Sequence, residues 1–125
     1  MPNILIVDDD VKFAEILAKG LTGDGHKVDC SATCQAALSA CASRRPDAVI
    51  LDIHLTNELG VDFARKIIAC PEEYGSPHII AMSGMLSDET REALEKRQEN
   101  HFAAFLIKPF PFNELSSLLH RLLPG

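Results

Sequence analysis

The sequence has no long hydrophobic run and no excess of positive charge. No apolar stretch approaches the ~20 residues that a transmembrane helix needs, and no signal peptide opens the chain. Acidic side chains outnumber basic ones, 18 to 12, so the formal net charge at pH 7 is -6. Because a nucleic-acid-binding surface needs a basic patch, we expect no nucleic-acid partner. These absences predict a cytoplasmic protein that does not enter a membrane.

The four cysteines lack the spacing of a metal-binding or redox motif. No two of them form a C-x-x-C pair, which argues against a zinc site and against a dithiol centre. Cys34 and Cys41 are seven residues apart and would share one face of a helix. We interpret all four, including Cys30 and Cys70, as small buried hydrophobic residues in a reducing compartment.

The chain has the length of one domain, residues 1–125, and contains no linker, repeat or low-complexity segment. Its core is predicted to form from short apolar segments that end on polar side chains. The clearest is the run of four apolar residues between Asp47 and Asp52, whose length and β-branched members favour a buried strand. The polar residues at the strand ends are Asp8, Asp9 and Asp10 after residues 4–7, Asp52 after 48–51, Ser83 after 78–82, and Lys108 after 105–107.

Segments of helical pattern separate these apolar runs. Strands that alternate with helices predict an α/β fold, here a doubly wound, five-stranded parallel sheet with five helices on its two faces. The expected helices lie at about 11–23, 33–43, 61–70, 88–100 and from 112 or 113 onward, with an edge strand at 26–31 and loops at 53–59 and 71–77.

Some side chains have an expected place in these helices. The third helix is expected to bury Ala64, Ile67 and Ile68. Asp10 and Thr33 are expected to cap the helices that follow them, because their short side chains accept hydrogen bonds from free helix N–H groups. The helix at 88–100 has almost no apolar residue, so we expect it to be solvated or to face a partner.

The carboxyl ends of parallel strands meet at one edge of a sheet, where open α/β folds place their ligands. Asp8, Asp9 and Asp52 would converge there. Two unit charges about 4 Å apart repel by roughly 4 kcal/mol at an effective dielectric of about 20. A cation would relieve this repulsion, and hard carboxylate oxygens suit Mg²⁺. Together with the Lys108 ammonium and the Ser83 hydroxyl, these groups favour phosphoryl transfer to an aspartate.

The chain resembles, over essentially its whole length, the CheY-like receiver domain of bacterial two-component response regulators. The matching segments are residues 4–10, 46–52 with Gly60 eight residues further on, 81–84 and 105–110. The resemblance implies the flavodoxin-like strand order 2-1-3-4-5. It also implies a phosphoacceptor that assists its own phosphorylation and dephosphorylation without turning over an external substrate.

The resemblance implies a role for each residue of the site. Asp52 accepts the phosphoryl group from the phosphohistidine of a histidine kinase or a histidine phosphotransfer protein. Asp8, Asp9, Asp52 and the backbone carbonyl of His54 bind Mg²⁺ or Mn²⁺. The other assignments are Ser83 and Lys108 on phosphoryl oxygens, Phe105 as an aromatic that turns inward on activation, Gly60 in a turn, and Pro109 after a cis peptide bond.

No DNA-binding segment follows the last helix, so we expect the chain to act without an output domain. Its signal would then leave through protein contacts. The expected surface is the fourth helix, the last strand and the last helix, which would bind a downstream protein or a second copy of the chain.

Two other functions compete with the phosphoacceptor. A phosphatase of the haloacid-dehalogenase type also uses an aspartate after its first strand, and Asp8-Asp9-Asp10 matches its Asp-x-Asp motif. That family needs an acidic pair near the chain end, whereas only Glu114 follows Lys108. A receiver fold that no longer takes phosphate is the other alternative, and the intact set of polar strand ends argues against it.

Overall fold

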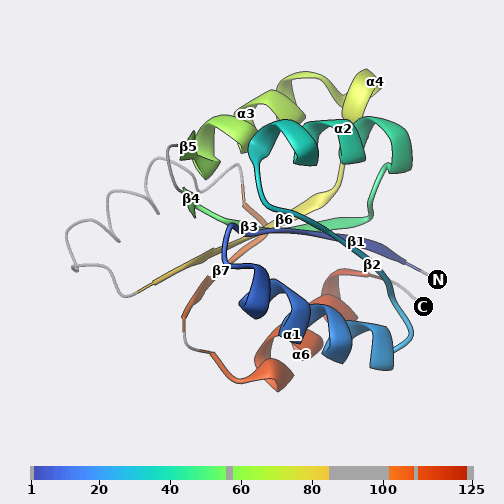
Figure 1. Cartoon of the computed structure of the whole chain (residues 1–125). Coiled ribbons are helices and arrows are strands. Elements are labelled where there is room, and N and C mark those ends of the chain that lie inside the picture. Colours follow the sequence, from blue (N-terminus) through green and yellow to red (C-terminus); the bar gives the residue numbers. More distant parts are fainter. Residues whose placement is uncertain (1, 56–57, 85–101, 109, 124–125) are drawn as a thin grey trace.

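The computed structural model describes residues 2–55, 58–84, 102–108 and 110–123 (Figure 1). Within these residues one parallel sheet of five strands has the order β2-β1-β3-β6-β7. This order confirms the predicted 2-1-3-4-5 arrangement. The strands are β1 (Asn3–Val7), β2 (Lys27–Ser31), β3 (Ala48–Asp52), β6 (His78–Ser83) and β7 (Ala104–Ile107).

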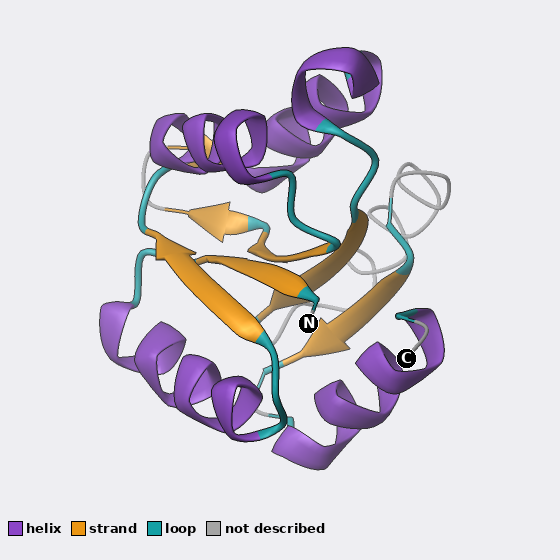
Figure 2. Ribbon diagram, turned by 90° about the vertical axis from the view of Figure 1, so that its right-hand side faces the viewer, coloured by secondary structure: helices purple, strands orange, loops and turns teal. Residues whose placement is uncertain are grey.

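Helices cover both faces of the sheet (Figures 1 and 2). On one face lie α1 (Val11–Gly23) and α6 (Phe112–Leu122). On the other lie α2 (Cys34–Arg44), α3 (Gly60–Ala69) and the short α4 (Pro71–Tyr74). The doubly wound α/β fold is therefore confirmed, and the predicted helix at 88–100 lies outside the described residues. No helix in the described part of the chain is long and apolar enough to cross a membrane.

The central strands are apolar throughout because both of their faces are covered. In β1, Ile4 and Ile6 belong to the core under α1 and α6, whereas Leu5 and Val7 belong to the core under α2 and α3. Strand β3 divides in the same way between the two cores, and all five of its residues are buried. An alternating strand would have left one face open to water, so the unbroken run is the signal of a two-sided core.

The helix starts follow the predicted capping. The Asp10 carboxylate accepts a hydrogen bond from the N–H of Phe13 at 3.2 Å, and Thr33 accepts one from Ala36 at 3.1 Å. Each bond satisfies one of the free N–H groups of a first helical turn, which fixes where the chain leaves the sheet. For α1 this point lies directly beside the carboxylates that follow β1.

Three details of the prediction were wrong. The loop at 53–59 contains a small antiparallel hairpin, β4 (His54–Leu55) with β5 (Glu58–Leu59). The loop at 71–77 contains α4, which begins at Pro71 because a proline needs no N–H partner in a first turn. Ile68 is 44% exposed, and Phe63 is buried with Ala64 and Ile67 because those residues share the inner stripe of α3.

The prediction for the cysteines was only partly right. Cys41 is buried, and burial raises the pKa of its thiol to about 11. Cys34 packs against the same core, so the two do share a helix face. Cys30 and Cys70 are exposed, since Cys30 lies on the edge strand β2 and Cys70 lies between α3 and α4.

Candidate functional site

Two carboxylates are placed side by side by the register of the central strands. Val7 of β1 pairs with Leu51 of β3, so the next residues, Asp8 and Asp52, lie together at the carboxyl edge. Their backbones stay tied to the sheet: Asp8 donates its N–H to the Ser31 carbonyl at 3.0 Å. Asp8 is 1% exposed and Asp52 is 7% exposed. The sheet thus holds two acids in a poorly solvated place.

Asp9 completes a cluster of three carboxylates. One carboxylate oxygen from each of Asp8, Asp9 and Asp52 lies within 4.8 Å of the other two. The convergence predicted from the strand ends is therefore present. Three hard oxygen donors at this separation fit Mg²⁺, which prefers oxygen ligands and is usually held by few carboxylates. The described residues thus contain an acidic pocket that could bind a metal ion.

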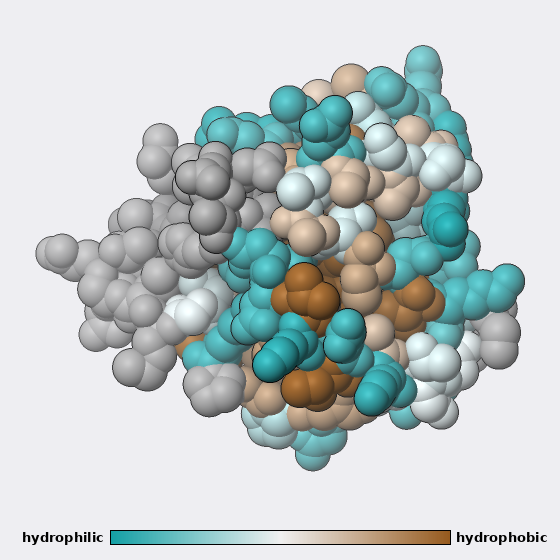
Figure 3. Space-filling view, viewed as in Figure 1, coloured by the Kyte–Doolittle hydropathy of each residue, from teal (hydrophilic) through white to brown (hydrophobic). Residues whose placement is uncertain are grey.

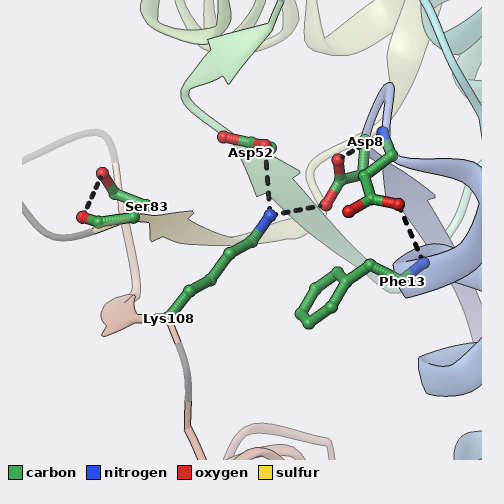
Figure 4. A network of polar contacts seen from close by, with 7 residues as sticks. Asp8, Phe13, Asp52, Ser83 and Lys108 are labelled. Atoms are coloured by element: carbon green, nitrogen blue, oxygen red, sulfur yellow. Dashed lines mark hydrogen bonds and ion pairs between the residues drawn. The ribbon is translucent and has the colours of Figure 1, made fainter.

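Lys108 reaches this pocket from the end of β7, across the end of β6 (Figure 4). Its ammonium nitrogen Nζ lies 2.8 Å from Oδ2 of Asp8 and 3.2 Å from Oδ2 of Asp52. The backbone N–H of Lys108 donates to the carbonyl of Ser83 at 2.6 Å, which anchors the lysine backbone to β6. One positive charge is thereby shared between two buried carboxylates and reduces their repulsion.

For both Asp8 and Lys108, burial and ion pairing shift the pKa in opposite directions. Burial raises the pKa of Asp8 above its usual value, although hydrogen bonds from Lys108 and from the N–H of Asp10 oppose that shift. Burial alone would lower the pKa of Lys108, but its hydrogen bonds and the charges of Asp8 and Asp52 outweigh burial and raise it. The lysine therefore stays charged at neutral pH, as a neutralising role at a phosphate requires.

One aromatic ring contacts the lysine and a second packs against the first, and the sequence analysis did not include either ring in the site. The Nζ atom of Lys108 lies over the ring of Phe13, 4.3 Å from its centroid. The Phe13 ring meets Phe110 edge to face, with centroids 6.1 Å apart and an interplanar angle of 89°. The available signal was the place of Phe13 in the first turn after the three aspartates.

Ser83 lies apart from the ion-paired network in Figure 4. It is fully buried at the end of β6, and its hydroxyl donates to the carbonyl of Gly84 at 3.1 Å. To bond a phosphoryl group on Asp52 the hydroxyl would have to turn from this carbonyl. Because the hydroxyl has a single proton, the predicted role of Ser83 requires it to give up its bond to Gly84.

Four further residues were predicted to belong to the site: His54, Gly60, Phe105 and Pro109. His54 begins β4 two residues after Asp52, and Gly60 is the first residue of α3. Phe105 on β7 is half-buried and lines a cavity of about 360 Å³ between β7 and α6. Pro109 lies outside the described residues, so its predicted cis bond stays a prediction.

Comparisons with known proteins agree on the class. The profile of the response regulator receiver domain matches residues 4–120. The KDP operon transcriptional regulatory protein KdpE of Escherichia coli (strain K12) is 31% identical over 95% of this chain, which covers 50% of KdpE. A two-component response regulator from Clostridium difficile superposes with a TM-score of 0.86 at 23% identity, covering 98% of this chain and 96% of that one.

A receiver domain from Leptospira biflexa, the non-phosphorylated HemR domain, superposes with a TM-score of 0.81. It is 26% identical, and the match covers 100% of this chain and 96% of that one. The chain belongs to the receiver-domain family of response regulators. It spans about half the length of the curated relatives it matches. The expectation that it acts without an output domain stays a prediction.

Proposed function

We propose that this receiver domain accepts a phosphoryl group on Asp52 from a phosphohistidine and then changes a surface that another protein recognises. The observation that carries the proposal is the Lys108 ammonium, hydrogen-bonded to both Asp8 and Asp52 at a buried carboxyl edge. Asp8 and Asp52 share the strand-end position, this lysine and the carboxylate cluster, but Asp8 accepts bonds on both of its oxygens and its side chain is 0% exposed, whereas the side chain of Asp52 is 10% exposed and so more open to a donor. Asp8 and Asp9 are the partners that would hold the metal beside it.

The transfer is a displacement at phosphorus. An oxygen of Asp52 forms a bond to phosphorus while the P–N bond to the imidazole breaks. The leaving nitrogen keeps the electron pair and takes a proton from the partner or from water. Lys108 balances negative charge on the phosphoryl oxygens, and Ser83, once turned from Gly84, donates to another oxygen. Bound Mg²⁺, or Mn²⁺, on Asp8, Asp9, Asp52 and the His54 carbonyl would neutralise further charge.

Two surfaces suit the protein contacts of this cycle. Near the site, α1 exposes Val11 (55%) and Ile16 (68%), and Figure 3 shows apolar surface among hydrophilic side chains on this side of the molecule. A partner that delivers phosphohistidine needs such an apolar anchor beside the acceptor. The cavity between β7 and α6, beside Phe105, supports an output surface there, and the rest of the predicted face, at 88–100, lies outside the described residues.

The phosphatase alternative predicts turnover, whereas a phosphoacceptor predicts a stoichiometric product. We therefore propose that the chain does not turn over an external substrate. Its relatives include transcriptional regulators, but those proteins are about twice as long as this chain. Their control of transcription is therefore not carried over to it. For this chain we propose output through protein contacts.

The proposal is tested with phosphoramidate, a small donor with a P–N bond, so that no partner surface is needed. Intact-mass spectrometry should show one phosphate per chain with Mg²⁺ and none with EDTA. The same sample should release no phosphate from p-nitrophenyl phosphate beyond the buffer rate. Sustained ester turnover would favour the phosphatase, and a wholly unmodified chain would favour a receiver that no longer takes phosphate.

A further inference from the structure

The Lys108 ammonium has a third contact that carries no charge. Two carboxylate oxygens hold Nζ, at 2.8 Å on Asp8 and 3.2 Å on Asp52, and the face of the Phe13 ring lies 4.3 Å away. Figure 4 shows the ammonium between the two acids and the Phe13 side chain beside it. An aromatic face attracts a cation through its quadrupole, and the attraction grows where water is excluded. The ring therefore favours the position that the ammonium occupies in the pocket.

The Phe13 ring is itself fixed. Its backbone N–H is bonded to the Asp10 cap at 3.2 Å, so the residue lies in the first turn of α1, directly after the three aspartates. Phe110, from the other end of the chain, meets the ring edge to face at 6.1 Å. Both rings pack against the core between α1 and α6. An edge-to-face pair is a favoured aromatic geometry, so Phe110 supports one orientation of the Phe13 ring.

A neutral ring suits this place better than another acid. A third carboxylate on the ammonium would compete with an incoming phosphoryl oxygen and would add to the repulsion in the pocket. The ring constrains the four-carbon lysine stem but leaves its charge available. It also tolerates a small shift, because the attraction extends over the whole ring face rather than along one bond. The ammonium can thus follow the phosphoryl group once Asp52 carries it.

We propose that Phe13 is a positioning residue for phosphorylation: the face of its ring, supported by Phe110, holds the Lys108 ammonium between Asp8 and Asp52. The inference rests on the proposed acceptor role of Asp52. It adds that the rate of phosphorylation depends on Phe13, an uncharged residue of α1 that contacts the lysine and is neither the acceptor nor a metal ligand.

The test replaces the aromatic face with a smaller aliphatic side chain and then separates the effect of packing from that of the ring. Phe13→Leu should lower the phosphorylation rate from phosphoramidate at saturating Mg²⁺ by about tenfold, and Phe13→Tyr should restore most of it. In parallel, the Lys108 Cε protons should show an upfield ring-current shift in the NMR spectrum of the wild type and of Phe13→Tyr. That shift should vanish in Phe13→Leu. Phe112→Leu is the matched control, because that ring packs over Gly20 instead of the lysine and should leave rate and shift unchanged.

Fluorinated phenylalanines at position 13 separate packing from the cation–ring contact. They keep the shape of the ring but weaken its negative face, so the rate should fall stepwise with each added fluorine while the melting temperature stays nearly constant. Equal rates for wild type, Phe13→Leu and the fluorinated proteins would overturn the inference and leave the proposed function intact. Wild type that takes no phosphate at all would overturn the proposed function, and this inference with it.

Discussion

Asp52→Asn is expected to remove phosphate acceptance completely. The amide keeps the shape of the side chain at the end of β3, but it is neutral and cannot act as the carboxylate nucleophile that the transfer needs. Intact-mass spectrometry after phosphoramidate and Mg²⁺ should therefore show only the unmodified mutant. No other change in the site should have a larger effect, because every other group assists a nucleophile that this variant lacks.

Asp62→Asn is the matched control for that experiment. Asp62 lies on α3 with its side chain 65% exposed, 4.0 Å from Arg65, and has no part in the carboxylate cluster. It should accept phosphate at the wild-type rate. If Asp52→Asn were labelled as fully as this control, the acceptor would be another residue and the assignment of Asp52 would be wrong.

Asp9→Ala is expected to abolish most of the stabilisation that Mg²⁺ gives the fold. A ligand that binds only the folded state at a hundredfold excess over its Kd raises the free energy of unfolding by about 2.7 kcal/mol. Removing one of three carboxylate donors should weaken binding enough to lose most of that gain at the same Mg²⁺ concentration. Thermal unfolding with EDTA and with Mg²⁺ gives the difference in melting temperature for each protein.

Baseline stability can shift in this variant, since taking away one acid also relieves repulsion around Asp8 and Asp52. The informative quantity is therefore the Mg²⁺-dependent difference, not the melting temperature itself. Asp62→Ala serves as the control for a lost negative charge and should keep the full difference. An undiminished Mg²⁺ effect in Asp9→Ala would place the metal somewhere other than the carboxylate cluster.

The sheet and its acidic edge were predictable because their signals depend little on distant contacts. A run such as Ile4 to Val7 is apolar throughout and too short for a helix, which is the pattern of a strand covered on both faces. Once β1 and β3 are neighbours, the register places Asp8 beside Asp52 without further information. Lys108 was predictable in the same way, since its long side chain can reach across the end of β6.

The features that sequence reasoning missed are those set by packing or by very short elements. The strands β4 and β5 have two residues each, too few for any periodic pattern. Along α3, apolar residues at both 67 and 68 left the inner stripe ambiguous, and the buried ring of Phe63 decided it. The contact between Lys108 and Phe13 joins the residue that follows β7 to a residue of α1, so no local pattern encodes it.

The most direct test of the account is to locate the phosphate on the wild-type chain. After phosphoramidate and Mg²⁺, borohydride reduction converts an aspartyl phosphate into homoserine, which marks the acceptor for peptide mass spectrometry. We expect a single homoserine at position 52, absent when EDTA replaces Mg²⁺. Homoserine at position 8 or 9 instead, or a chain that remains unmodified throughout, would contradict it.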